Sequence, residues 1–371
     1  MKFVSDQHSL QTALQQLGKV TPTRSTLPIL SSVVLSTEED RLSLRATDLE
    51  ISQVIYIPTT VSEVGSVAVQ QRTILEIVSE VQAGDLEVEV DENRKLVMKT
   101  SLGKYSIMGK PIEEFPSLPE IATVQEVRLS GNSLKRIIEK TTFAASRDEL
   151  KPSLMGVLFQ FHEDTFKAVA TDGHRLVKHV RSDYKNDGYR GDSIIPIKFL
   201  HILSTYLVDN EDVTLNISEN HIFMSNKETV LFSRIIDERF PDYESVFPKD
   251  NDKHLKVDRD ELLSAIRRVS IFSNKTTHQI ALRLSQEGME ITTEDVETMS
   301  EAKEALACEY EGEPLVIGYN SNYVRDLISH IDSQKIHMEF RTPVTAAIIY
   351  PDEQQENEEL TMLIMPIRLN D

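Results

Sequence analysis

One stretch decides how this chain is organised: Ala170-Thr171-Asp172-Gly173-His174-Arg175-Leu176. An Asp-Gly pair between two alternating apolar runs predicts a β-hairpin, because glycine accepts a positive φ at little cost. The hairpin places a histidine and an arginine beside a sharp turn. Three interpretations are open at this point: a catalytic pair of Asp172 and His174, a ligand pocket, and ordinary turn chemistry.

Parts of this stretch recur along the chain and reveal an internal repeat. Ala46-Thr47-Asp48 precedes Ala170-Thr171-Asp172 by 124 residues, and Phe115-Pro116 precedes Phe240-Pro241 by 125. In a third, fainter copy Thr292-Thr293-Glu294 stands where the Thr-Asp pair stood. Motifs that recur at a nearly constant spacing of about 124 residues predict domains that share one fold. We therefore expect three similar domains, at residues 1–120, 126–248 and 254–371.

Each third is predicted to contain two short helices, because apolar residues recur three and four positions apart. The helices are expected at 9–19, 71–82, 133–143, 198–207, 261–270 and 322–331. Asn132 and Asp260 are candidate N-caps for two of them. Alternating apolar runs between the helices predict strands, and the last strand is expected at Thr361–Leu369. The fold class is therefore α+β, with two helices packed on antiparallel sheets in each domain.

The composition limits the classes of function. The chain has 371 residues and a formal net charge of −20, which argues against broad, unspecific binding to nucleic acid or anionic lipid. Its one cysteine, Cys308, cannot form an intramolecular disulfide and suits a reducing compartment. An isolated cysteine is more often a small core residue than a nucleophile. Without a signal peptide or an apolar run of ~20 residues, a cytoplasmic protein is expected.

The positive charge is concentrated on the predicted helices. These helices carry nine basic and five acidic residues, although the chain as a whole is acidic. Lys135, Arg136 and Lys140 lie opposite the apolar face of their helix, and Arg267 and Arg268 do so less cleanly. A single basic face is usually an ordinary solvated surface. Its repetition over several helices favours contact with phosphate backbones without base reading.

Motifs of the common enzyme classes are missing from the sequence. It has no phosphate-binding Gly-x-x-x-x-Gly-Lys-Ser/Thr, no His-Glu-x-x-His and no Gly-x-Ser-x-Gly. The ten histidines are scattered singly, which gives no indication of a metal site. Asp172 and His174 are conceivable as a dyad, but no nucleophile motif accompanies them. We therefore expect a protein that is not an enzyme and that has no cofactor and no catalytic or metal-binding residues.

With these features combined, the chain resembles the bacterial DNA polymerase III beta subunit family, the processivity sliding clamps. The resemblance runs from end to end. Its most specific motifs are Thr171–Leu176 and the closing Met365-Pro366-Ile367-Arg368-Leu369. Further support comes from Met1-Lys2-Phe3, Thr26-Leu27-Pro28-Ile29-Leu30, Ala46-Thr47-Asp48-Leu49-Glu50 and Arg239-Phe240-Pro241-Asp242-Tyr243.

The resemblance implies a head-to-tail homodimer, a ring of six similar domains that encircles duplex DNA and slides along it. Twelve helices of about 10 Å width would line a bore of roughly 28 Å, wide enough for a duplex and water. Such a ring tethers its partners, and the replicative polymerase, the clamp loader and repair factors all bind it through short linear peptides. The alternative is a protein-binding scaffold of the same fold that does not encircle DNA.

The resemblance and the charge count together suggest the site residues. By resemblance, the residues that face DNA are Arg24, Arg72, Lys151 and Lys198. The charge count adds Lys135, Arg136, Arg267 and Arg268. The resemblance places the partner-peptide pocket at Leu154, Thr171, Gly173, His174, Arg175, Leu176, Pro241, Val246, Asn320, Tyr323, Met365, Pro366, Ile367, Arg368 and Leu369.

The resemblance also locates the joint between subunits and shows where this chain departs from the family. The strand region Gly103–Gly109, with Tyr105 and Ile107, is expected to meet Ile271 and Phe272 of the partner subunit. A sheet continued across the joint would satisfy the hydrogen bonds of edge strands. Glu244-Ser245 stands where some relatives have a basic residue, and Asn370-Asp371 extends past the usual end. Both departures concern the walls of the pocket.

Overall fold

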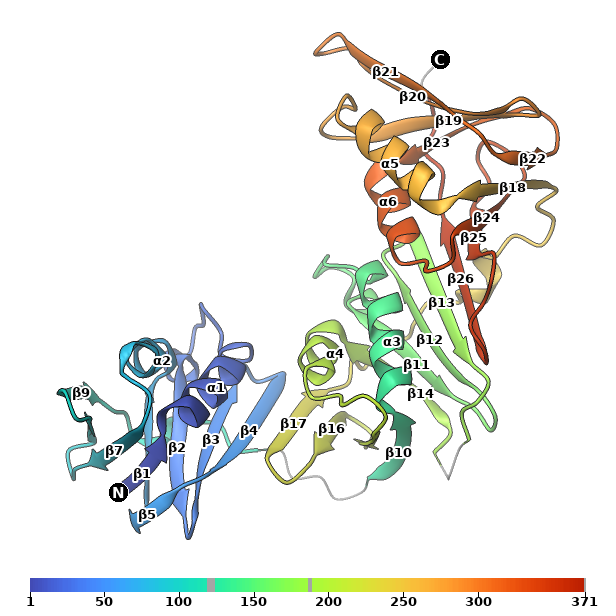
Figure 1. The fold of residues 1–371 in the computed structure, drawn as a ribbon. Helices are drawn as coiled ribbons and strands as arrows, with labels where there is room; N and C mark the ends of the chain where they lie inside the picture. Colours follow the sequence, from blue (N-terminus) through green and yellow to red (C-terminus); the bar gives the residue numbers. More distant parts are fainter. Residues whose placement is uncertain (119–123, 186–188, 370–371) are drawn as a thin grey trace. The chain divides into compact units, whose positions relative to one another are not determined.

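The computed structural model describes residues 1–118, 124–185 and 189–369 (Figure 1). The chain forms two compact units. One is Met1–Ser130 with His201–Ile235, and the other is Gly131–Leu200 with the segment that begins at Ile236. Two limits of the predicted domains, residues 120 and 371, lie outside the described residues. The three domain boundaries stay a prediction of the sequence.

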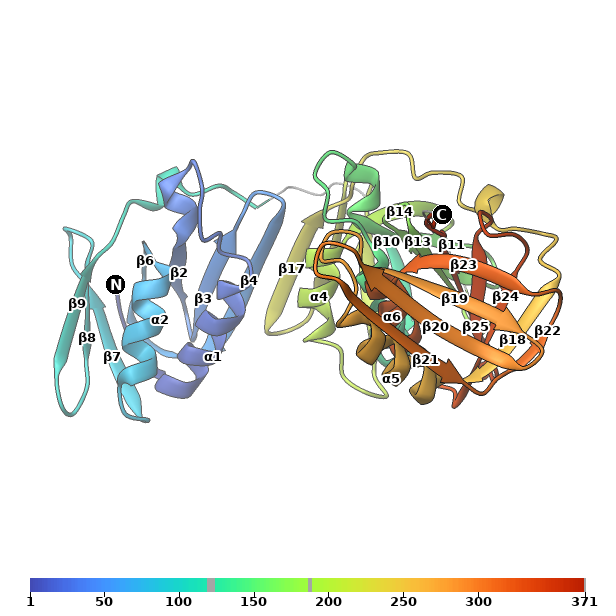
Figure 2. The same cartoon turned by 90° about the horizontal axis from the view of Figure 1, so that it is seen from above.

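The first unit holds two antiparallel sheets. The five-stranded sheet has the order β5 (Thr60–Glu63), β1 (Lys2–Asp6), β7 (Asp85–Val90), β8 (Lys95–Lys99) and β9 (Lys104–Met108). The eight-stranded sheet has the order β10 (Gln125–Ser130), β15 (Asp212–Ile217), β16 (His221–Ser225), β17 (Thr229–Arg234), β4 (Ile51–Pro58), β3 (Arg41–Thr47), β2 (Ser32–Glu38) and β6 (Gly65–Gln70). Helices α1 (Gln7–Gly18) and α2 (Gln71–Glu80) lie side by side (Figure 2).

The second unit repeats this plan. Its nine-stranded sheet has the order β14 (Gly191–Pro196), β11 (Gly156–Phe161), β12 (Phe166–Thr171), β13 (Arg175–Arg181), β26 (Glu358–Ile364), β25 (Ala347–Pro351), β24 (Lys335–Phe340), β18 (Lys253–Asp258) and β22 (Glu309–Glu311). Its four-stranded sheet has the order β21 (Ser300–Leu306), β20 (Gly288–Asp295), β19 (Gln279–Ser285) and β23 (Leu315–Asn320). Helix α3 (Gly131–Thr141) packs on β12 and β13, and α5 (Arg259–Ser270) packs beside α6 (Ser321–Ser329). Helix α4 (Ile197–Ser204) crosses the limit between the units.

The helices form where the apolar spacing predicts them, but most of their ends were misplaced by up to three residues. Helix α5 begins at Arg259 because Asp258 is its N-cap: the Asp258 carboxylate accepts the N–H groups of Asp260 and Glu261, both at 3.0 Å. The prediction of Asp260 as N-cap is therefore wrong, and Asn132 also lies inside its helix. Apolar periodicity marks the buried face of a helix and carries no information about its polar first turn.

The last strand is shorter than predicted. It ends at Ile364 and not at Leu369, and Pro366, which has no N–H to donate to a sheet, follows two residues later. The chain then crosses to β23, where the N–H of Ile367 donates to the carbonyl of Gly318 at 2.9 Å. A Cβ on Gly318 would lie 2.6 Å from Leu369 Cδ2, so glycine is what allows this close approach.

The turn at Asp172-Gly173 is built twice from the same hydrogen bonds. Thr171 Oγ1 accepts the N–H of Gly173 at 3.0 Å, and Thr47 Oγ1 accepts the N–H of Leu49 at the same distance. The residue two positions after the threonine has a positive φ in both turns, +89° at Gly173 and +82° at Leu49. In the third copy Asp295 takes the place of the threonine: its carboxylate accepts the N–H of Glu297, and it pairs with Ser300 as Thr171 pairs with Leu176. The predicted register, with Thr293 in that place, is therefore wrong by two residues.

The order of the strands repeats as well. Three sets have equivalent order: β6-β2-β3-β4, β14-β11-β12-β13 and β23-β19-β20-β21. A second kind of set is β1-β7-β8-β9, β10-β15-β16-β17 and β18-β24-β25-β26. The last strands of the two kinds pair with each other in β4·β17 and in β13·β26. Among the described residues, the equivalent strands β9 and β21 remain at sheet edges.

Candidate functional site

The turn at 172–175 is joined to helix α6 and to the C-terminal segment. The His174 ring stacks on Tyr323 of α6, with ring centroids 5.6 Å apart and planes 15° apart. The His174 carbonyl accepts the N–H of Met365 at 2.8 Å. Residues about 150 and 190 positions apart in the chain thus form one surface. After the pocket that the sequence predicts, we call it the docking surface: His174, Tyr323 and Met365.

Asp172 shapes the turn and does not form the side-chain contact that a catalytic pair needs. Its Oδ1 accepts the N–H groups of His174 and Arg175, at 2.9 and 3.0 Å. Its Oδ2 accepts from Nε of Arg175 at 3.1 Å. The carboxylate is thus occupied by the turn, while the His174 ring faces Tyr323. The turn-chemistry interpretation explains Asp172, and the ligand-pocket interpretation of His174 stays a prediction.

A buried apolar cluster lies next to the turn. It joins Leu176 of β13 to residues of four other strands and of two connecting segments, and its members are Leu158, Val169, Leu176, Ile194, Tyr243, Ala346 and Leu363. Phe240 and Phe247, half-buried, pack against it. They flank the predicted pocket residues Pro241 and Val246, both exposed, on the segment that covers the cluster. Sequence reasoning did not include Tyr243, Ala346 and Leu363. Strand alternation was a signal for Leu363 alone, because Tyr243 and Ala346 lie outside the strands.

The predicted pocket residues include both buried and exposed side chains. Leu154, Thr171 and Leu176 are buried, whereas Val246 and Met365 are 47% and 40% exposed. Asn320 caps α6, with its side chain accepting the N–H of Asn322 at 2.9 Å. Exposed apolar side chains beside buried ones are typical of a surface that binds apolar anchors.

The two departures from the family have different outcomes. Glu244 lies 3.9 Å from the ammonium of Lys167, so a cation lies next to this carboxylate. Ser245 donates to the carbonyl of Asp242 at 2.8 Å and closes a short turn. The Asn370-Asp371 extension lies outside the described residues.

Seven of the eight predicted DNA-facing residues are exposed: Arg24, Arg72, Lys135, Lys151, Lys198, Arg267 and Arg268. Arg72 pairs with Glu76 on the same helix at 2.8 Å, and Arg268 donates to Glu304 at 3.1 Å. With their observed bounds, the helices of the described residues carry nine basic and six acidic residues. The helices therefore carry a smaller excess of positive charge than the predicted helix bounds gave, because one more acidic residue falls within them.

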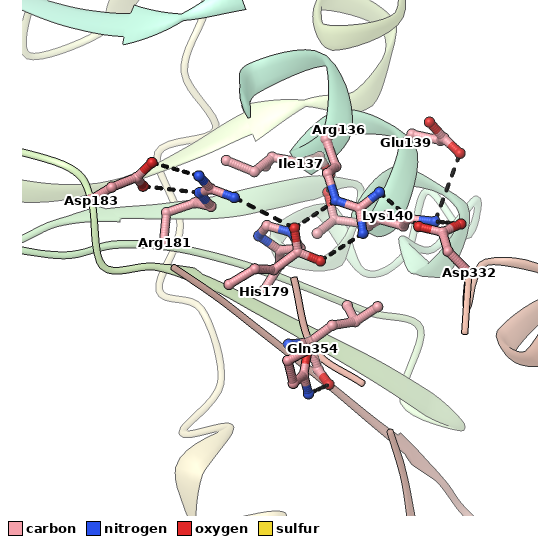
Figure 3. A network of polar contacts seen from close by, with 12 residues as sticks. Arg136, Ile137, Glu139, Lys140, His179, Arg181, Asp183, Asp332 and Gln354 are labelled. Atoms are coloured by element: carbon pink, nitrogen blue, oxygen red, sulfur yellow. Dashed lines mark hydrogen bonds and ion pairs between the residues drawn. The ribbon is translucent and has the colours of Figure 1, made fainter. Parts of the chain in front are cut away.

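Arg136 and Lys140 do not form the solvated basic face that the charge count predicted (Figure 3). Arg136 donates from Nε to Glu358 at 2.5 Å and from Nη1 to Asp332 at 2.7 Å. The Lys140 side chain is 1% exposed, and its ammonium reaches Asp332 at 2.7 Å. The two cations tie α3 to the start of β26 and to the loop after α6. We call this group the ionic network; so far it comprises Arg136, Lys140, Asp332 and Glu358. Its carboxylates pair with both cations.

His179 and Arg181 complete the ionic network. His179 Nε2 lies 3.4 Å from Glu358 Oε2, and Arg181 Nη1 lies 3.6 Å from the same oxygen (Figure 3). Burial alone would raise the pKa of Glu358, but the His179 ring and the Arg136 guanidinium outweigh it. Together they lower this pKa from 4.5 to about 2. Glu358 therefore remains a carboxylate in the folded protein until strongly acidic pH.

The predicted joint residues lie at the edge strands and beside them. Tyr105 and Ile107 are on β9, an edge of its sheet, and Tyr105 is exposed. Ile271 and Phe272 follow α5 directly, and both are exposed. The edge strand β21 was not among the predicted residues, because its alternation of polar and small residues gives no sign of an unpaired edge.

Within the described residues, no group of three or more His, Cys, Asp or Glu side chains is arranged to hold a metal ion. In the same part of the chain, no helix has the length and apolar character needed to cross a membrane.

Comparison with known proteins gives three consecutive family matches. Models of the DNA polymerase III beta subunit match its N-terminal domain at residues 1–119, its central domain at 128–242 and its C-terminal domain at 244–368. The "Beta sliding clamp" of Pseudomonas putida is 31% identical over 372 residues, which cover 100% of both chains. The chain belongs to the DNA polymerase III beta subunit family.

Solved structures agree with this assignment over the full length. The DNA polymerase III subunit beta of Pseudomonas aeruginosa matches with a TM-score of 0.92 and 29% identity, covering 100% of both chains. The sliding clamp of Bartonella birtlesii, solved bound to griselimycin, matches with a TM-score of 0.93 and 29% identity over the same coverage. The predicted family and the predicted clamp fold, with few helices on antiparallel sheets, are confirmed.

The ionic network predicts how stability depends on pH. A carboxyl group whose pKa is lowered by folding stabilises the protein above its unfolded pKa, and this contribution is lost as pH falls through the folded pKa. The substitution Glu358→Gln is therefore expected to lower the free energy of unfolding at pH 7 by on the order of 3 kcal/mol, since the half-buried guanidinium groups of Arg136 and Arg181 lose a buried carboxylate partner. The deficit, measured by thermal unfolding, should shrink as pH falls from about 5 towards 2.

Glu359→Gln is the matched control, because this neighbouring carboxylate is exposed and lies 3.6 Å from Lys178. It should cost about 0.5 kcal/mol or less, with little dependence on pH. Equal losses for the two variants would show that the ionic network does not stabilise the fold.

Proposed function

We propose that this chain is a processivity clamp whose two copies close head to tail into a ring around duplex DNA. The ring slides on DNA and tethers the replicative polymerase, and its docking surface also receives the clamp loader and repair factors. Membership in the beta sliding clamp family supports the general role.

The pattern of sheet edges is the observation that carries the ring. Wherever the two kinds of four-stranded set meet inside the chain, their last strands pair, in β4·β17 and in β13·β26. β9 and β21 occupy the equivalent positions and are edges within the described residues. A second copy can supply the missing pairing, β9 of one subunit on β21 of the other. The same contact made twice closes a ring of two subunits.

The surroundings of the two edges support this pairing. Leu102, just before β9, and Met108, the last residue of β9, are exposed apolar residues, and beside β21 so are Phe272 and Met299. Exposed backbone at a sheet edge pairs readily with another strand, and exposed apolar side chains next to it add buried area. The predicted contact of Tyr105 and Ile107 with Ile271 and Phe272 of the partner subunit is part of the same proposal.

The proposed DNA contact is weak and independent of sequence. The seven exposed basic residues would attract phosphates, but the small helix excess and the ion pairs of Arg72 and Arg268 limit the attraction. We therefore assign retention on DNA to encirclement, and assign to these residues only a weak attraction to phosphates that does not depend on sequence. Arg136 is left out of the proposed set, because Asp332 and Glu358 occupy its guanidinium.

The docking surface suits a short peptide with apolar anchors. His174 and Tyr323 present stacked rings, and Met365, joined to the His174 carbonyl, is exposed. Leu176, two residues along the chain, belongs to the buried cluster. Because the Bartonella birtlesii relative binds griselimycin, we propose that this chain binds griselimycin at the docking surface. The proposed clamp has no catalytic residue: Asp172 holds the turn, and His174 serves binding. A scaffold of the same fold that never encircles DNA is the alternative.

Encirclement predicts that retention depends on DNA topology. The protein, loaded onto a nicked circular plasmid by a clamp loader with ATP, is expected to co-elute with the circle in gel filtration and to be released after a single cut. Retention on the circle should persist at high salt, because only the electrostatic part of binding weakens there. Equal retention on cut and uncut DNA would contradict encirclement and favour the scaffold.

The docking surface predicts a specific loss of ligand binding. His174→Ala removes the ring that stacks on Tyr323, and stacking of this kind contributes about 1 kcal/mol. Griselimycin affinity, measured by isothermal titration calorimetry, is expected to fall by about fivefold or more, with the thermal stability unchanged. His254→Ala, at an exposed histidine on β18, is the control. An equal loss for both variants, or none for His174→Ala, would contradict this placement.

A further inference from the structure

We infer that Phe143 and Asp326 are positioning residues of the docking surface, which act through Arg175 and fix the spacing between the 172–175 turn and helix α6. The inference rests on the proposed function, since it concerns the same surface. It assigns a role to two side chains that face Arg175 and not the stacked pair of His174 and Tyr323.

Arg175 is held by acceptors from three separate elements. Its Nε donates to Asp172 of its own turn at 3.1 Å, and its Nη1 donates to Asp326 of α6 at 2.7 Å. Its Nη2 donates to the carbonyl of Phe143, in the 3₁₀ turn after α3, at 2.8 Å. A guanidinium is planar and presents its donors in a fixed fork, so three such partners define the orientation of the group.

Aromatic rings add a second set of constraints to Arg175. Its guanidinium carbon lies 4.9 Å from the ring centre of Tyr323 and 5.4 Å from that of Phe143. Phe143 in turn stacks on His330, with centroids 3.7 Å apart and planes 6° apart. The contacts therefore run from His174 through Tyr323, Arg175 and Phe143 to His330, and we call this series the ring column.

The ring column closes on the end of α6. His330 is the C-cap of that helix, and its Nδ1 lies 2.7 Å from the carbonyl of Asp326. Asp326 thus contacts the ring column twice, through its carboxylate at Arg175 and through its backbone at His330. Phe143 and Asp326 come from elements almost 200 residues apart, and Arg175 is the group that both of them hold.

Burial makes the arrangement sensitive to the loss of either partner. Arg175 is 8% exposed, and a nearly buried guanidinium that loses a carboxylate keeps its charge and shifts towards another acceptor or water. Since Tyr323 packs on Arg175, such a shift changes the gap between Tyr323 and His174. A surface that is no longer preorganised binds its ligand more weakly even though every ligand-contacting side chain remains.

The test compares four variants by griselimycin titration calorimetry on the full chain. Asp326→Asn and Phe143→Leu are each expected to weaken binding by about three- to tenfold. Phe143→Tyr keeps the ring and should bind within about twofold of the unchanged protein, a rescue that a general loss of stability would not give. Asp260→Asn is the matched control, because Asp260 is an exposed helix carboxylate paired with Arg259 at 2.8 Å. It should leave affinity unchanged.

The outcomes separate this inference from the proposed function. If the unchanged protein does not bind griselimycin, the proposed docking surface fails and the inference fails with it. If it binds and His174→Ala weakens binding, but Asp326→Asn and Phe143→Leu bind normally, the inference alone is overturned. If Phe143→Tyr is as weak as Phe143→Leu, the ring of Phe143 is not the positioning group, which also overturns the inference for this residue.

Discussion

The pairing of β13 with β26 is the interaction on which the rest of the second unit depends. Seven residue pairs join the strands, from Arg175 opposite Ile364 to Arg181 opposite Glu358. At one end this pairing brings His174 to Met365 and Tyr323, and at the other it brings Glu358 to Arg136 of α3. The docking surface and the ionic network are thus the two ends of one strand pair, and the apolar cluster around Leu176 and Leu363 lies beside it.

The same kind of strand pairing is the basis of the proposed contact between two copies of the chain. Pairing of equivalent last strands occurs at β4·β17 and at β13·β26, and within the described residues β9 and β21 lack that partner. An unpaired strand edge flanked by exposed apolar residues can pair with another strand. The repeated pairing of last strands therefore favours binding of a second copy at β9 and β21. The proposed ring follows from the repeat itself, and the small excess of positive charge on the helices fits retention by encirclement better than retention by attraction.

The sequence predicted what is local and missed what depends on distant partners. The turn at Asp172-Gly173 and the apolar faces of the helices follow from spacing alone, and the structure has them. Helix periodicity also placed Arg136 opposite the apolar face of α3. Its partners Asp332 and Glu358 lie 196 and 222 residues further on, so nothing near Arg136 could show that it is occupied. Phe143 and Asp326 were missed for the same reason, since their shared contact with Arg175 exists only in the folded chain.

Disulfide cross-linking between copies tests the pairing of β9 with β21 most directly. In a Cys308→Ser background, one chain carries Ser106→Cys on β9, and a second carries a single cysteine at successive positions along β21. Head-to-tail pairing predicts covalent dimers only when the two chains are mixed, and only at alternate β21 positions, because side chains alternate between the faces of a strand. Dimers formed by the Ser106→Cys chain alone, or none at any position along β21, would contradict the ring.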